Sequence, residues 1–124
     1  MCPGKKSCIM VVDDEPSILM VLEEFLIREG FNVLTAKNGK DAIDLAAKNK
    51  IDLVLLDMAL PILSGTKTMV ELKKILPNII VIMITAYRDA EQVVEAFQLG
   101  AVNCIFKPFN LTNVRKSIKD KLME

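Results

Sequence analysis

Two kinds of hydrophobic spacing alternate along the chain. Short and nearly continuous apolar runs, typical of strands, occur at residues 8–12, 31–36, 51–56, 79–84 and 103–106. After each run, apolar residues recur every three or four positions, which is the spacing of an amphipathic helix. Five strands in strict alternation with five helices predict an α/β fold with a parallel sheet.

Apolar residues also mark the face that each predicted helix turns toward the core. The five faces are Ile18, Leu22, Phe25 and Leu26; Ala42, Ile43, Ala46 and Ala47; Met69, Leu72 and Leu76; Ala90, Val93, Val94 and Phe97; and Leu111, Val114, Ile118 and Leu122. Residues that favour helix ends stand at the boundaries, and these are Pro16, Gly30, Asn38, Asp89, Gly100 and Asn110. The spacing and the boundary residues therefore agree on five helices.

The composition of the strands indicates their order in the sheet. Residues 9–12, 53–56 and 79–84 are continuously apolar, as expected for strands covered by helices on both faces. The runs at 31–36 and 103–106 contain polar residues, which is typical of edge strands. We therefore predict a doubly wound, flavodoxin-like (βα)5 fold with strand order 2-1-3-4-5, in which the binding crevice lies at the carboxyl ends of the strands.

The length and composition fit one domain over residues 1–124. The chain is 52% hydrophobic and 26% charged, and surface scaling for this size allows about two thirds of the unfolded surface to be buried. No repeat, Ser/Gly-rich linker or low-complexity segment divides it. A core can therefore form without disulfides or a structural metal.

Charge and residue content exclude several classes of function. Lys and Arg total 16, as do Asp and Glu, so no net basic field favours direct binding of nucleic acid or of an anionic membrane. The longest apolar run, 79–84, is too short to span a bilayer. The three cysteines are odd in number and form no C-x-x-C pair, which indicates reduced thiols and a cytoplasmic protein. Because it lacks histidine, the chain has no Ser-His or Cys-His pair, no imidazole zinc site and no phosphohistidine of its own.

Polar residues stand at the carboxyl ends of four of the predicted strands. They are Asp13-Asp14-Glu15 after the first strand, Asp57 after the third, Thr85 after the fourth and Lys107 after the fifth. A single aspartate in such a place is usually a solvated residue or a helix cap. Four strand ends that meet in one crevice instead predict a functional site.

Carboxylates gathered at this edge need a cation. Two of them about 5 Å apart repel each other by roughly 3 kcal/mol at an effective dielectric constant of about 20. Oxygen ligands without imidazole or a thiolate pair suit Mg²⁺, with Mn²⁺ as the alternative. Lys107 adds a fixed positive charge. A carboxylate beside a divalent ion, a lysine and a hydroxyl can accept a phosphoryl group, because the cations neutralise charge on the transferring oxygens.

These residues resemble the receiver domain of bacterial two-component response regulators over nearly the whole chain. The similar segments are 11–15, 36–39, 52–57, Leu60-Pro61 with Ser64-Gly65, Thr85-Ala86, 99–101 and Lys107-Pro108-Phe109. Each segment is short, but their joint order and spacing on five strand-helix units is specific.

The resemblance implies a role for each residue at the crevice. Asp57 is the implied phosphoacceptor, which takes a phosphoryl group from a phosphohistidine of a sensor histidine kinase or of a histidine phosphotransfer protein. Lys107 would pair with the phosphoryl oxygens, and Thr85 would donate a hydrogen bond to one of them. The implied Mg²⁺ ligands are Asp13, Asp14, Asp57 and the backbone carbonyl of Ala59. The Lys107-Pro108 peptide is expected to be cis.

Such a domain signals through a change of shape and is not an enzyme in the usual sense. The resemblance implies only self-catalysed phosphotransfer and slow autodephosphorylation, with a downstream effector that meets helix four, strand five and helix five. Cys104 stands where an aromatic switch residue is common, so that switch cannot operate in its usual form. Tyr87, two residues after Thr85, could shield the phosphoryl group or be an exposed loop ring.

Other functions share parts of this pattern. A flavodoxin-type nucleotide binder needs a Gly/Ser/Thr-rich loop after the first strand, where this chain has three acidic residues. An aspartyl-phosphate hydrolase would carry its nucleophile after the first strand and would have a cap domain. In this chain the best candidate nucleophile, Asp57, follows the third strand, and we expect no cap domain. Two further alternatives are a receiver fragment of a longer DNA-binding or enzymatic regulator and a degenerate receiver that only docks; the five site residues disfavour the second.

Overall fold

A computed structural model describes residues 7–86 and 90–122 and contains one five-stranded sheet. All strand pairs are parallel, and the order is β2-β1-β3-β4-β5. The strands are β1 (Cys8–Val12), β2 (Asn32–Ala36), β3 (Leu53–Asp57), β4 (Ile80–Thr85) and β5 (Asn103–Phe106). The predicted fold class, strand order and edge strands are therefore confirmed.

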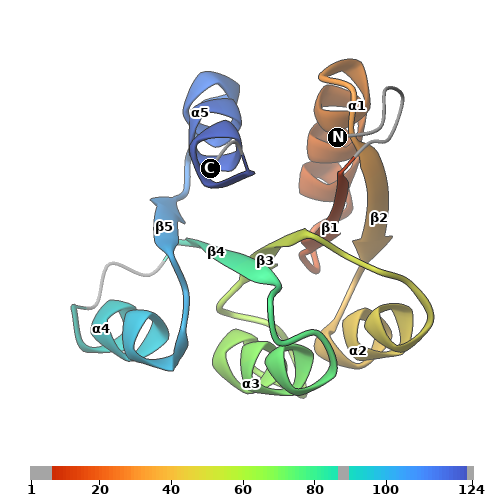
Figure 1. The fold of residues 1–124 in the computed structure, drawn as a ribbon. Helices are drawn as coiled ribbons and strands as arrows, with labels where there is room; N and C mark the ends of the chain where they lie inside the picture. Colours follow the sequence, from red (N-terminus) through yellow and green to blue (C-terminus); the bar gives the residue numbers. More distant parts are fainter. Residues whose placement is uncertain (1–6, 87–89, 123–124) are drawn as a thin grey trace.

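Five helices cover the two faces of the sheet. They are α1 (Pro16–Arg28), α2 (Gly39–Lys48), α3 (Gly65–Ile75), α4 (Ala90–Leu99) and α5 (Leu111–Leu122). Figure 1 shows α1 and α5 on one face and α2, α3 and α4 on the other. Within the described ranges, no helix combines the length and the apolar character that crossing a bilayer requires.

Each face of the sheet has its own hydrophobic core. Alternate residues of a strand point to opposite faces, so Met10 of β1 belongs to the core under α2, α3 and α4. Its neighbour Ile9 packs with Leu22 of α1 and Ile118 of α5 on the other face. Apart from Asp57 and Thr85 at their ends, the central strands are apolar because both of their faces are buried.

Two of the strands that carry the site, β3 and β4, start and end later than the apolar runs predict. Residue Ile51 is buried but precedes β3. Its neighbour Asp52 instead bonds to the start of β1, because its side-chain Oδ2 accepts from the N–H of Cys8 at 2.8 Å. At the other end, Asp57 and Thr85 are the last residues of β3 and β4. Both site residues are thus held by the sheet itself.

Most of the predicted helix boundaries are confirmed. Pro16 is the first residue of α1. The side chains of Asn38 and Asn110 cap α2 and α5 by accepting from backbone N–H groups three residues later, at 2.8 Å in each case. Gly30 and Gly100 have φ angles of 96° and 121°, which favour glycine after a helix. Asp89 lies outside the described residues.

Two of the four apolar residues that form the predicted face of α4 lie at the surface. Val94 and Phe97 are 52% and 44% exposed, whereas Ala96 is fully buried. Figure 1 shows α4 at the end of its layer, beside the edge strand β5. A helix at this position meets the core along a narrow line, so Val94, Phe97 and also Leu99 remain at the surface.

Gly65 allows the start of α3 to lie directly against the end of β3. A Cβ atom at this position would be 2.6 Å from Cα of Met58 and would also collide with the carbonyl oxygen of Asp57. The N–H of Gly65 donates to the carbonyl of Met58 at 3.0 Å. Both contacts are with backbone, which cannot move aside as a flexible side chain can. Glycine therefore fixes the distance between α3 and the strand that carries Asp57.

We expect Gly65→Ala to destabilise the protein by about 1–3 kcal/mol, because the new methyl group overpacks against backbone. Helix propensity alone predicts that the same change increases stability by about 1 kcal/mol. The sign of the change in stability therefore distinguishes the two effects. Urea unfolding measures the difference. Lys67→Ala, at an exposed position of the same helix, is the control and should change stability by no more than about 0.5 kcal/mol. A stabilised Gly65→Ala protein would contradict the close approach.

Candidate functional site

The parallel sheet brings four polar strand ends to one edge. The N–H of Asp13, directly after β1, donates to the carbonyl of Ala36 in the neighbouring strand at 3.1 Å. Asp57 is in register with Ile84 of β4. The N–H of Lys107, directly after β5, donates to the carbonyl of Thr85 at 2.8 Å. Backbone pairing alone therefore places the predicted site residues side by side.

Three carboxylates form an acidic cluster at this edge. One oxygen from each of Asp13, Asp14 and Asp57 lies within 4.8 Å of the others. Asp13 and Asp57 are only 2% and 4% exposed, whereas Asp14 is exposed. Three oxygen ligands at this spacing, without a nitrogen or sulfur ligand, suit a hard divalent cation. The cluster predicted from the strand ends is thus present and fits divalent metal binding.

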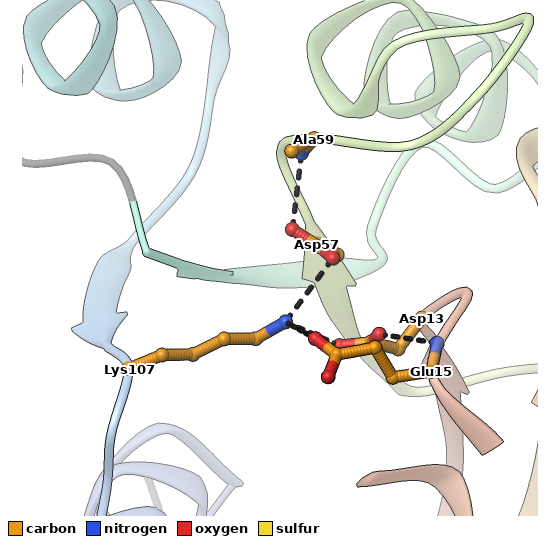
Figure 2. A network of polar contacts seen from close by, with 5 residues as sticks. All are labelled: Asp13, Glu15, Asp57, Ala59 and Lys107. Atoms are coloured by element: carbon orange, nitrogen blue, oxygen red, sulfur yellow. Dashed lines mark hydrogen bonds and ion pairs between the residues drawn. The ribbon is translucent and has the colours of Figure 1, made fainter. Parts of the chain in front are cut away.

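Lys107 supplies the positive charge in the cluster. Its Nζ lies 2.8 Å from Oδ2 of Asp13, 3.2 Å from Oδ2 of Asp57 and 3.2 Å from Oε1 of Glu15. Figure 2 shows the lysine reaching these three carboxylates. Burial alone would lower the pKa of Lys107, but the hydrogen bond and charges of Asp13 and Asp57 outweigh it and raise the pKa. The lysine is therefore a permanent cation at this site.

The two buried aspartates share one arrangement. Oδ1 of Asp13 accepts from the N–H of Glu15 at 2.9 Å, and Oδ1 of Asp57 accepts from the N–H of Ala59 at 3.0 Å. The Oδ2 atom of each aspartate faces Lys107. Burial is the largest influence on Asp13 and raises its pKa, although the hydrogen bond from Lys107 acts in the opposite direction. Each carboxylate thus has one oxygen held by its own loop and one turned toward the cation.

Thr85 and the Lys107-Pro108 peptide complete the edge. Thr85 is fully buried at the end of β4. The Lys107-Pro108 bond is cis, as the resemblance implies. Cys104, at the position of the missing aromatic residue, is half-buried in β5 and packs against the core. Tyr87 lies outside the described residues.

Two contacts were not predicted from the sequence. In the sequence Glu15 is only part of an acidic run, yet its side chain reaches Lys107, which is 92 positions away. The second is the hydrogen bond that the N–H of Ala59 donates to Oδ1 of Asp57; the carbonyl of Ala59 stays a predicted metal ligand. The sequence does contain one indication that Glu15 is unusual. It stands directly before Pro16, at the N-cap position of the predicted helix, where Ser, Thr, Asp or Asn is the usual residue.

A cavity opens beside the acidic cluster. Its volume is about 470 Å³, and it is lined by Glu15, Ile18, Ala86, Lys107, Pro108 and Phe109. Lys107 belongs both to this cavity and to the contacts of Asp57.

Comparison with known proteins identifies a family with this architecture. The profile of the response regulator receiver domain matches residues 9–119. The chain is 38% identical to sporulation initiation phosphotransferase F of Bacillus subtilis over 92% of each chain. It is 34% identical to the transcriptional regulatory protein ZraR of Escherichia coli over 92% of this chain, but spans only 26% of that longer protein.

Solved structures agree with the sequence comparisons. The CheY-like response regulator receiver domain protein of Methanospirillum hungatei superimposes with a TM-score of 0.92 at 30% identity, and the match covers 95% of this chain and 94% of that one. The family profile extends from β1 into α5 and so includes residues of all five strand-helix units. The acidic cluster and its lysine lie at the carboxyl end of the same sheet. The chain therefore belongs to the response regulator receiver domains, the phosphorylatable signalling modules of two-component systems.

Proposed function

We propose that Asp57 accepts a phosphoryl group from a phosphohistidine of a sensor histidine kinase or a histidine phosphotransfer protein. The observation that carries this proposal is the environment of its carboxylate. One oxygen accepts from the N–H of Ala59, and the other faces the ammonium group of Lys107. Such a carboxylate is held in one orientation, and its reacting oxygen lies beside a permanent cation.

The transfer forms one bond and breaks one. An oxygen of Asp57 attacks phosphorus, an O–P bond forms, and the N–P bond to the donor imidazole breaks with its electron pair on nitrogen. Lys107, 3.2 Å from Oδ2 of Asp57, is placed to meet charge on the phosphoryl oxygens. Thr85, which ends the neighbouring strand, would donate its hydroxyl hydrogen bond to one of these oxygens.

We assign the acidic cluster to Mg²⁺, with Mn²⁺ as an alternative that takes the same oxygen ligands. Asp13, Asp14, Asp57 and the backbone carbonyl of Ala59 would hold it. When bound, the ion neutralises charge on the oxygens of the transferred group. Asp13 and Asp57 are fixed for this role by the N–H groups of Glu15 and Ala59.

A downstream effector would recognise the phosphorylated state at the surface formed by α4, β5 and α5. Phosphorylation replaces one negative charge by about two at neutral pH, and Thr85 and Lys107 are the side chains that would follow it. Thr85 is paired with Phe106 of β5, and Lys107 directly follows β5 and donates its N–H to the carbonyl of Thr85. Val94 and Phe97, two of the exposed apolar residues of α4, lie on the proposed effector surface. We propose a protein effector, because the balanced net charge offers no field for direct nucleic-acid binding.

The proposed protein is a single receiver domain over residues 1–124 that acts in the cytoplasm with reduced thiols and loses its phosphate by slow autodephosphorylation. The length match with sporulation initiation phosphotransferase F favours this form. The match to only 26% of the length of the regulator ZraR keeps a receiver within a longer protein as the second candidate. The length of the native reading frame distinguishes the two.

Incubation with acetyl phosphate and Mg²⁺ should add one phosphoryl group to the chain, because Asp57 provides a buried and oriented nucleophile. Intact-mass spectrometry measures the addition. Asp57→Asn is nearly the same size and should remain unmodified. Equal modification of both proteins would refute the assignment of Asp57, and no modification of the wild type would favour a receiver that only docks.

Stabilisation by Mg²⁺ should increase with pH. Because the pKa of Asp13 is raised in the folded protein, protonation of this carboxyl stabilises the folded, metal-free state at low pH. This contribution to the free energy of unfolding is lost as the pH rises from about 4 through the pKa of the folded state. Mg²⁺ binds the ionised carboxylates and offsets their repulsion. The rise in melting temperature on adding MgCl₂ should therefore be larger at about pH 7 than at about pH 4. NaCl at equal ionic strength is the control, and an equal response at both pH values would contradict the prediction.

Activation should move β5 only slightly, because Cys104 offers no aromatic ring that could change position. Amide NMR spectra with and without beryllofluoride, a phosphoryl analogue, measure the response in the presence of Mg²⁺. We expect shifts around Asp57, Thr85 and α4 and small ones in β5. Cys104→Tyr should enlarge the response of β5, and Asp57→Asn should abolish the whole response. Large shifts throughout β5 of the wild type would contradict this view.

A further inference from the structure

Glu15 makes a contact that the proposed phosphotransfer does not use. Its Oε1 lies 3.2 Å from Nζ of Lys107. Figure 2 shows Glu15 and Asp13 reaching the ammonium group from the end of β1, while Asp57 reaches it from the end of β3. The lysine is therefore shared among three carboxylates from two strand ends.

The backbone of Glu15 is fixed on both sides. Its N–H donates to Oδ1 of Asp13 at 2.9 Å, and its carbonyl accepts from the N–H groups of Ile18 and Leu19 at 3.1 and 3.2 Å. Glu15 is the N-cap residue of α1, but its side chain makes no capping hydrogen bond. Pro16 follows and has no N–H that needs a cap. The carboxylate is thus left to reach Lys107 from an anchored main chain.

The three partners of Lys107 differ in what else they can bind. An ammonium group has three N–H donors, and three carboxylate oxygens surround this one. Asp13 and Asp57 belong to the acidic cluster, whose spacing suits a divalent cation, but Glu15 does not. A cation in the cluster would compete with Lys107 for Asp13 and Asp57 and would repel the ammonium group. Glu15 is the partner that stays available among those the structure describes.

We propose that Glu15 is a positioning residue that retains Lys107 beside Asp57 while a divalent cation occupies the carboxylates of Asp13 and Asp57. This inference rests on the proposed function, because it requires a cation in the acidic cluster. Glu15 lowers the free energy of the cation-bound state by giving the displaced ammonium group a partner. Its side chain is 57% exposed, so the same ion pair contributes little to folding stability. The effect of Glu15 should therefore appear in metal affinity and not in unfolding.

Mg²⁺ titrations followed by amide NMR test this role in wild type, Glu15→Gln and Glu24→Gln. The second variant is the matched control, because it removes the same charge from an exposed position of the same helix. We expect the Mg²⁺ dissociation constant to rise about two- to fivefold in Glu15→Gln and to stay at the wild-type value in Glu24→Gln. The urea midpoints of all three proteins should agree closely.

The same titration in a Lys107→Met background shows whether Glu15 acts through the lysine. There the effect of Glu15→Gln should shrink, because no ammonium group needs a partner. An equal effect in both backgrounds would overturn the proposal, since Glu15 would then act on the metal by its charge alone. Wild-type affinity in Glu15→Gln would also overturn it and leave the proposed function intact. A wild type that binds no Mg²⁺ would overturn both.

Discussion

Two negative charges are almost wholly withdrawn from water at one end of the sheet, and much of the local structure compensates for this. Removing a carboxylate from water costs several kcal/mol unless it is paired and hydrogen-bonded. Asp13 and Asp57 each meet this requirement in the same way, with one oxygen on a backbone N–H and the other on Lys107. The loops after β1 and β3 and the end of β5 must all be in place for this to hold.

The fold connects this cluster to the rest of the molecule through backbone contacts. Gly65 lets α3 rest on the end of β3, directly beside Asp57. The N–H of Lys107 is bound to the carbonyl of Thr85, so the ends of β4 and β5 cannot move independently without loss of that bond. A change of charge at Asp57 therefore acts on elements that are already joined. Such an arrangement favours a shift between two packed states over a gradual deformation.

Much of this structure could be predicted from the sequence because the signals were local. The apolar runs predicted the sheet and its order, and polar strand ends predicted the cluster, because parallel strands bring their carboxyl ends to one edge. The face of α4 could not be predicted, since the exposure of Phe97 depends on the position of that helix at the end of its layer. The contact of Glu15 with Lys107 was also missed, because spacing along the chain carries no information about a pair 92 positions apart.

That long separation has a consequence for synthesis of the chain. The acidic residues are made early, whereas their lysine follows β5, close to the last helix. A growing or truncated chain without β5 would carry the aspartates but not the cation that lets them be buried together. Formation of the site therefore depends on the presence of β5 and the lysine that follows it. Asp57 therefore meets the environment described above only in a chain that has folded from β1 to β5.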